Sequence, residues 1–170
     1  MGAIVAPVQL ERIDRLVEEG RAEGATIWQP SWSVPREGWF YPPTLCTDVH
    51  PTATIVQEEI FGPVVTLQTF RTPREAVELA NNTRYGLAAS VWTENVNLAL
   101  DVAPAIKAGT VWVNCYNVFD PAVPFGGFKM SGMGLSMFSK GRLSLVPTKS
   151  RQVDQLRKII NTARETGKRK

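Results

Sequence analysis

The sequence predicts an α/β fold in which helices cover a parallel β-sheet. Three observations lead to this class. Apolar, β-branched runs at residues 64–70, 87–93 and 109–114 alternate with helical segments at the spacing of right-handed βαβ crossovers. A Thr-Pro pair at residues 72–73 supplies an N-cap followed by proline at the first helical position. The run at residues 110–113 has the composition of a strand that is buried on both faces.

The first part of the chain is less regular. Residues 8–22 carry apolar side chains at three- and four-residue steps, which predicts an amphipathic helix that Gly24 ends. Residues 25–28 are expected to form a short strand, and residues 29–38 a loop. Residues 40–46 form a short extended segment, in which two adjacent prolines argue against a central strand.

In the rest of the chain, the sequence predicts regular helices and strands first and an irregular segment later. We expect helices at residues 72–82 and 94–103, and Pro104 disturbs or ends the second. Residues 135–150 are expected to be irregular. A last helix is predicted at residues 152–166, where apolar side chains share one face.

The charge is distributed unevenly. Residues 140–170 carry ten Lys or Arg and two acidic residues, whereas residues 1–139 carry nine Lys or Arg and fourteen acidic residues. Such a basic tail supports weak, salt-sensitive binding to anions. It has no aromatic residue after Phe138, so base stacking has no platform and we expect no nucleic-acid partner. We therefore divide the chain into a main domain at residues 1–150 and a basic C-terminal helix or tail at residues 151–170.

Composition favours a soluble protein of the cytoplasm. The 170 residues are 44% hydrophobic and 21% charged, which suits one globular domain with a buried core. No apolar run approaches the roughly 20 residues that span a bilayer, so no membrane is expected. Cys46 and Cys115 lack metal-ligand spacing and are expected to be reduced thiols, with no metal site.

A rigid turn follows two carboxylates in the stretch QEEIFGPVV at residues 57–65. Gly62 and Pro63 predict the turn, because glycine tolerates unusual backbone angles and proline fixes its own φ. The turn would hold Glu59 and Phe61 two positions apart. A carboxylate that accepts two hydroxyl protons beside an aromatic face suits a ribose next to a flat heterocycle. The alternative is a solvated glutamate and a core phenylalanine.

Three further motifs follow this turn in order: ANNTRYGLAA at residues 80–89, AGTVWVNCY at 108–116 and PFGGFKMSGMG at 124–134. Together with EEIFGP at residues 58–63, this set resembles the carboxy-terminal part of the catalytic domain in the aldehyde dehydrogenase superfamily. The resemblance covers about residues 2–134. It implies a partial aldehyde dehydrogenase catalytic domain, followed by the basic helix.

The resemblance also implies a chemistry. In the family, a cysteine thiolate attacks an aldehyde, a hydride passes to NAD or NADP, and the thioester is hydrolysed to a carboxylic acid. The nucleophilic cysteine, the general base and most of the dinucleotide-binding domain lie upstream of the matched region. We therefore expect no catalytic residue here and no oxidation by the chain alone. Cys115 falls at a family position that is not the nucleophile, so we predict a structural role.

Five residues match family positions of the site. The resemblance implies that Glu59 holds the hydroxyls of the nicotinamide ribose and that Phe61 lies beside that ribose. It implies that Asn117, Phe119 and Phe125 form part of the substrate tunnel, with an uncharged Asn117 where several relatives have aspartate. The alternative for the two phenylalanines is ordinary core packing.

The chain departs from the family pattern after Gly134. Where relatives have a β-branched strand that pairs with a neighbouring subunit, this chain has Pro147, which removes a ladder donor. Two hypotheses follow: a C-terminal fragment of an NAD(P)-dependent aldehyde dehydrogenase, or a non-catalytic interaction module with the same fold. In either case we expect a homo-oligomer or a partner that supplies the missing domains, and marginal stability without it.

Overall fold

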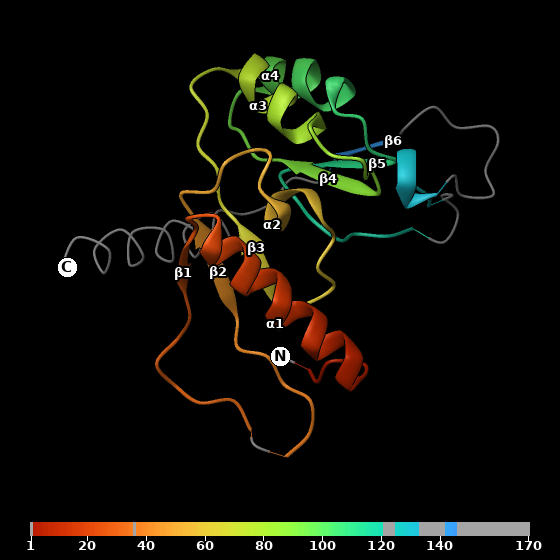
Figure 1. Ribbon diagram of the computed structural model, residues 1–170. Helices are drawn as coiled ribbons and strands as arrows, with labels where there is room; N and C mark the ends of the chain where they lie inside the picture. Colours follow the sequence, from red (N-terminus) through yellow and green to blue (C-terminus); the bar gives the residue numbers. More distant parts are fainter. Residues whose placement is uncertain (1, 36, 121–124, 133–141, 146–170) are drawn as a thin grey trace. The chain divides into compact units, whose positions relative to one another are not determined.

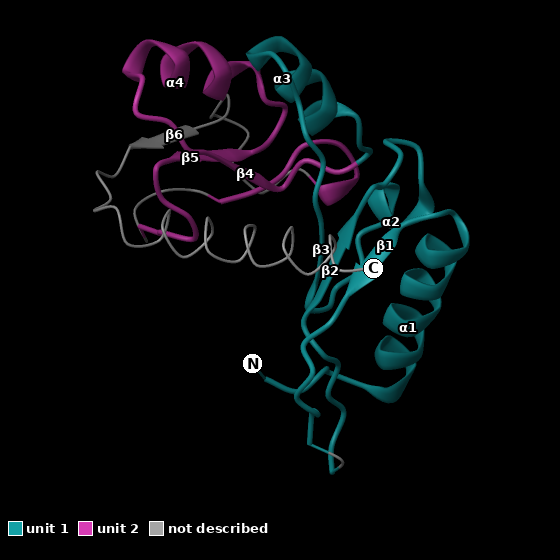
Figure 2. Cartoon of the chain, turned by 90° about the vertical axis from the view of Figure 1, so that its left-hand side faces the viewer, with its two compact units in different colours: residues 1–84 teal, residues 85–170 magenta. Residues whose placement is uncertain are grey.

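The computed structural model describes residues 2–35, 37–120, 125–132 and 142–145. Within it the chain forms two compact units, Met1–Arg84 and Tyr85–Lys170 (Figure 2). Each unit contains its own small sheet and its own cluster of buried side chains.

The first unit consists of a three-stranded sheet with a long helix on one face (Figure 1). The strand order is β1-β2-β3, with β1 antiparallel and β3 parallel to β2. Its elements, in chain order, are α1 (Pro7–Ala22), β1 (Thr26–Trp28), β2 (Thr44–Thr47), α2 (Thr54–Gln57), β3 (Val64–Thr66) and α3 (Pro73–Asn81).

Helix α1 buries the face that its sequence periodicity indicates. Ile13, Leu16 and Val17 are almost fully buried, and they form one cluster with residues of the sheet and of the turn before β3. Gly20 continues this face, and a Cβ placed there would lie 2.8 Å from Cδ1 of Ile55 in α2. The contact requires glycine, so α2 packs directly on the backbone of α1.

The second unit is built around a parallel sheet with strand order β4-β5-β6. Buried alanines of α4 and η1 pack on Val111 and Val113 of β5, and all four residues of β5 are buried. The elements of this unit are β4 (Ala88–Val91), α4 (Val96–Val102), the short 3-10 helices η1 (Ala103–Ala105) and η2 (Lys129–Ser131), β5 (Thr110–Val113) and β6 (Arg142–Leu145).

The predicted βαβ crossover is confirmed between β4 and β5, but the predicted strand at residues 64–70 was placed wrongly. Strand β3 has only three residues and pairs with β2, so it belongs to the other sheet. The N–H of Thr44 bonds to the carbonyl of Pro63, and that of Leu67 bonds to Cys46. The expectation that residues 40–46 lack a central strand was therefore wrong, because β2 begins at Thr44, directly after the two prolines, and is the middle strand of the sheet.

Two further differences concern short elements. Residues 135–150 were expected to be irregular, but Arg142–Leu145 forms β6, in parallel register with β5. Helix α2 was not predicted, because its single turn depends on a distant residue: both the N–H and the hydroxyl of Thr54 bond to the carboxylate of Glu23. The basic helix predicted at residues 152–166 and the division at residue 150 lie outside the described residues.

Among the described helices, none is both long enough and apolar enough to cross a membrane.

Gly109, just before β5, provides a test of the packing in the second unit. A Cβ at this position would lie 1.7 Å from the carbonyl oxygen of Gly126, and backbone atoms cannot yield as a flexible side chain does. Gly109→Ala should therefore lower the free energy of unfolding by about 3 kcal/mol or more. Urea unfolding followed by tryptophan fluorescence measures this. The control Gly2→Ala, with nothing within 4 Å, should unfold like the wild type; equal stability of both variants would contradict the packing described.

Candidate functional site

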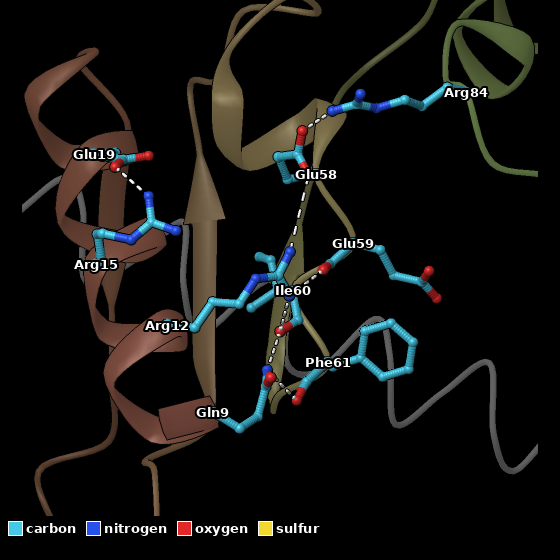
Figure 3. Close-up of polar contacts among 9 residues, drawn as sticks. All are labelled: Gln9, Arg12, Arg15, Glu19, Glu58, Glu59, Ile60, Phe61 and Arg84. Carbon is cyan, nitrogen blue, oxygen red and sulfur yellow. Dashed lines mark hydrogen bonds and ion pairs between the residues drawn. The ribbon is translucent and has the colours of Figure 1, made fainter. Parts of the chain in front are cut away.

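The turn between α2 and β3 is held by two side chains of helix α1 (Figure 3). Nε2 of Gln9 donates to the carbonyl oxygens of Ile60, at 2.7 Å, and Phe61, at 3.3 Å. Nη1 of Arg12 donates to the carbonyl oxygens of Glu59, at 2.9 Å, and Ile60, at 3.4 Å. Three consecutive carbonyls are thus bound from one helix, which fixes the path of the backbone through the turn.

Packing against α1 determines which side chains the turn exposes. Ile60 is buried in the cluster that includes Ile13. Gly62 lies so close to Ile13 that a Cβ would be 2.5 Å from its Cδ1. Between them, Phe61 has φ +55°, a left-handed conformation that costs a non-glycine residue about 1–2 kcal/mol. Its ring is turned outward, and the residue as a whole is 69% exposed.

Glu59 and Phe61 point to the same side, away from α1 (Figure 3). Within the part of the chain that the structure describes, the carboxylate of Glu59 has no hydrogen-bond or ion-pair partner, although its backbone carbonyl is bound by Arg12. Its neighbour Glu58 differs, since its carboxylate pairs with Arg12 and Arg84. The turn therefore presents a half-buried carboxylate and an exposed ring, with a backbone that cannot easily move.

The predicted tunnel residues lie in the second unit, on the loop after β5 and at the start of the glycine-rich loop. Asn114 begins the first loop in a left-handed conformation, and its side chain bonds to the backbone N–H and carbonyl of Thr93. The indole N–H of Trp112, which is 1% exposed, donates to the carbonyl oxygen of Val118 at 2.9 Å. These contacts fold the loop back over Trp112.

Three aromatic rings, one each from β5, from this loop and from the glycine-rich loop, contact one another edge to face. The ring centroids of Trp112 and Phe119 lie 5.6 Å apart, and the ring centroids of Phe119 and Phe125 lie 5.0 Å apart. Phe119 and Phe125 are 56% and 42% exposed, so they form a surface pair and not a fully buried core. Asn117 is exposed two residues before Phe119, with φ +59°. The structure thus brings the two phenylalanines into contact and places Asn117 on the loop that carries Phe119.

The glycine-rich loop is anchored by a residue that the sequence reasoning missed. The hydroxyl of Ser131 accepts the backbone N–H of Gly86 at 3.0 Å, and the N–H of Phe128 donates to the carbonyl of Gly86 at 2.8 Å. Gln9 and Arg12 were also missed. The available signal was their position three residues apart on the polar side of an amphipathic helix, but such side chains are usually solvated.

Neither cysteine has the surroundings of a nucleophile. Cys46 and Cys115 are 0% and 2% exposed. Burial raises the pKa of the Cys46 thiol to about 11, an effect that the nearby positive charge of Arg21 partly opposes. A neutral thiol away from solvent is unreactive, because the thiolate is the attacking form. The described residues also contain no group of three or more side chains that could hold a metal ion.

Comparison with known proteins identifies the class. The sequence matches the aldehyde dehydrogenase family over residues 1–167. It is 48% identical over 138 residues to an aldehyde dehydrogenase of Emericella nidulans, covering 81% of this chain and 28% of that protein. It is 47% identical over 133 residues to an aldehyde dehydrogenase of Agaricus bisporus, covering 78% of this chain and 27% of that protein.

A solved structure of an aldehyde dehydrogenase also matches most of this chain. The NAD+ complex of an aldehyde dehydrogenase from Bacillus cereus superposes with a TM-score of 0.75 at 46% identity, covering 81% of this chain and 28% of that one. The chain therefore belongs to the aldehyde dehydrogenase family. It spans little more than a quarter of the length of these relatives.

The burial of both thiols predicts their reactivity. In the folded chain neither Cys46 nor Cys115 should react with iodoacetamide at neutral pH, whereas both should react in denaturant. Mass spectrometry of the modified protein counts the alkylated thiols. Val5→Cys, at a position 84% exposed, is the matched control and should react at once in the folded state. Rapid modification of Cys115 in the native protein would contradict its structural role.

Proposed function

We propose that this chain forms the carboxy-terminal part of an NAD(P)-dependent aldehyde dehydrogenase, which oxidises an aldehyde to a carboxylic acid. The observation that carries the proposal is the outward-facing pair of Glu59 and Phe61 on a turn held by α1. The proposal is supported by family membership and by a related structure that was solved with NAD+.

The chemistry of this pair fits the nicotinamide half of the cofactor. A carboxylate offers acceptor lone pairs for two vicinal hydroxyl groups, as a ribose presents them. The Phe61 ring offers a flat apolar face beside that carboxylate. The cofactor supplies the hydride acceptor, while these residues bind and orient the sugar that carries it. Correct placement matters because a small displacement of a reacting group costs much of the rate.

We assign Asn117, Phe119 and Phe125 to the wall of the substrate tunnel. The two rings contact each other, Phe119 packs on the buried ring of Trp112, and Asn117 adds a polar group without charge. Such a wall favours the desolvation of an uncharged aldehyde and does not help to bind a cationic one. The nucleophilic thiol and the general base would come from residues outside these 170, or from a partner that carries them.

A second candidate function is a non-catalytic interaction module. Several large apolar side chains of the first unit are strongly exposed, among them Val8, Phe61 and Val65. Exposed apolar side chains that gather in one patch mark surfaces that another chain covers. The sequence upstream of Met1 in the source gene separates the two readings. A catalytic cysteine segment there supports the enzyme, and a different coding sequence supports the module.

The chain by itself should not oxidise aldehydes. Both of its thiols are buried, so no nucleophile is available to form the thiohemiacetal. Incubation of the purified chain with NAD+ or NADP+ and propanal or benzaldehyde, followed at the absorbance of the reduced cofactor, should give the rate of the blank. A rate above the blank that Cys115→Ala abolishes would overturn the assignment of Cys115 and this part of the proposal.

In a full-length enzyme that contains these residues, Glu59→Gln should impair cofactor placement. Loss of a charged hydrogen-bond partner costs on the order of 1–3 kcal/mol, or about 5- to 150-fold in kcat/KM for the cofactor. Steady-state kinetics at varied NAD+ and NADP+ measures this loss. Glu11→Gln, on the exposed side of α1, is the control and should leave kcat/KM unchanged for both cofactors. Equal kinetics for the two variants would exclude the proposed role of Glu59.

A further inference from the structure

The carboxylate of Glu58 is shared between two guanidinium groups that come from opposite sides of the turn. Oε1 of Glu58 pairs with Nη2 of Arg84, and Oε2 lies 3.8 Å from Nη2 of Arg12 (Figure 3). Arg12 belongs to α1, and Arg84 to the segment that follows α3. One side chain thus joins two elements that are otherwise separated by more than fifty residues of chain.

The Arg12–Glu58 pair is better sheltered than the other ion pairs of α1, although the Arg84 side chain is 50% exposed. The side chains of Glu58 and Arg12 are 27% and 33% exposed, compared with 61% and 40% for the Arg15–Glu19 pair one turn along the helix. Solvent screens exposed pairs strongly, so a pair such as Arg15–Glu19 contributes little. The more buried charge of Glu58 depends more on its partners, because fewer water molecules can replace them.

A neighbouring side chain makes a second contact with the segment after α3. Nε2 of Gln57 donates to the carbonyl oxygens of Pro51, at 2.7 Å, and Asn82, at 2.8 Å. Residues 57 and 58 therefore both contact the segment after α3, just before the turn begins. The turn is fixed on one side by α1 and on the other by this segment.

The two terminal nitrogens of Arg12 make contacts that constrain each other. Its Nη2 faces the Glu58 carboxylate, while its Nη1 donates to the carbonyls of Glu59 and Ile60. A guanidinium is a planar fork, so the position of one nitrogen determines that of the other. The carboxylate of Glu58 therefore orients the group that holds the next two carbonyls. This matters because the left-handed conformation of Phe61 persists only where the surroundings enforce it.

We propose that Glu58 is a positioning residue for the Glu59–Phe61 pair. By sharing its carboxylate between Arg12 and Arg84, it holds the turn in the conformation that presents both side chains outward. It contacts no ligand itself. The role of the pair toward the cofactor rests on the proposed function, whereas the control of the turn by Glu58 does not.

The first test measures the turn itself in the 170-residue chain. Glu58→Gln preserves size and removes the charge, so hydrogen exchange of the bonded amides at the two ends of the turn, those of Glu58 and Val64, should become about tenfold faster. The matched control Glu19→Gln breaks the exposed pair with Arg15 and should leave exchange of these amides unchanged. Arg84→Met should accelerate exchange of the same amides, and its effect should not add to that of Glu58→Gln. Unchanged exchange in Glu58→Gln, or equal acceleration in the control, would overturn the proposal.

The second test uses a full-length enzyme that contains these residues. Glu58→Gln should raise KM for NAD+ or lower kcat while the melting temperature stays near that of Glu19→Gln, and Glu58→Asp, which keeps the charge, should recover part of the loss. Faster exchange together with unaltered kinetics would overturn the positioning role, provided that Glu59→Gln is impaired. If Glu59→Gln is also unaltered, the proposed function of the pair fails, and the exchange experiment alone decides whether Glu58 controls the turn.

Discussion

Hydrogen bonds from helix α1 to the carbonyls of Glu59, Ile60 and Phe61 are the interaction on which the candidate site depends. A turn of this kind has no regular backbone pairing of its own, so its carbonyls need partners from elsewhere. Gln9 and Arg12 supply them, and both lie on the helix whose other face forms the core. The same helix thus stabilises the unit and determines the geometry of its exposed turn.

In the second unit, the loops are held mainly by close contacts between backbone segments. Gly86, Gly109 and Gly127 allow three segments to approach more closely than side chains permit. The hydroxyl of Ser131, on the glycine-rich loop that carries Phe125, then accepts the N–H of Gly86. The indole N–H of Trp112 donates to the carbonyl of Val118, on the loop that carries Phe119. In both units, buried or glycine-lined elements hold loops whose side chains remain exposed. This division suits a site in which a rigid scaffold positions the residues that meet a ligand.

Local patterns predicted those elements whose stability is local. Thr72 caps α3 as expected, accepting the N–H of Glu75 at 3.1 Å, and the apolar run before Asn114 forms a fully buried strand. The partner of β3 could not be predicted, because strand pairing depends on contacts between distant segments. The roles of Gln9 and Arg12 were hidden for the same reason. Glu59 and Phe61 were found only through their motif, since their exposure reflects packing of Ile60 and Gly62 on α1.

The most direct test of this account is a crystal structure, with NAD+ bound, of a protein that contains these residues. The account predicts a left-handed Phe61, Gln9 and Arg12 on the three carbonyls, and the Glu59 carboxylate within about 2.5–3.0 Å of the nicotinamide ribose hydroxyls. A ribose held elsewhere, with Glu59 turned back toward a protein partner, would contradict it.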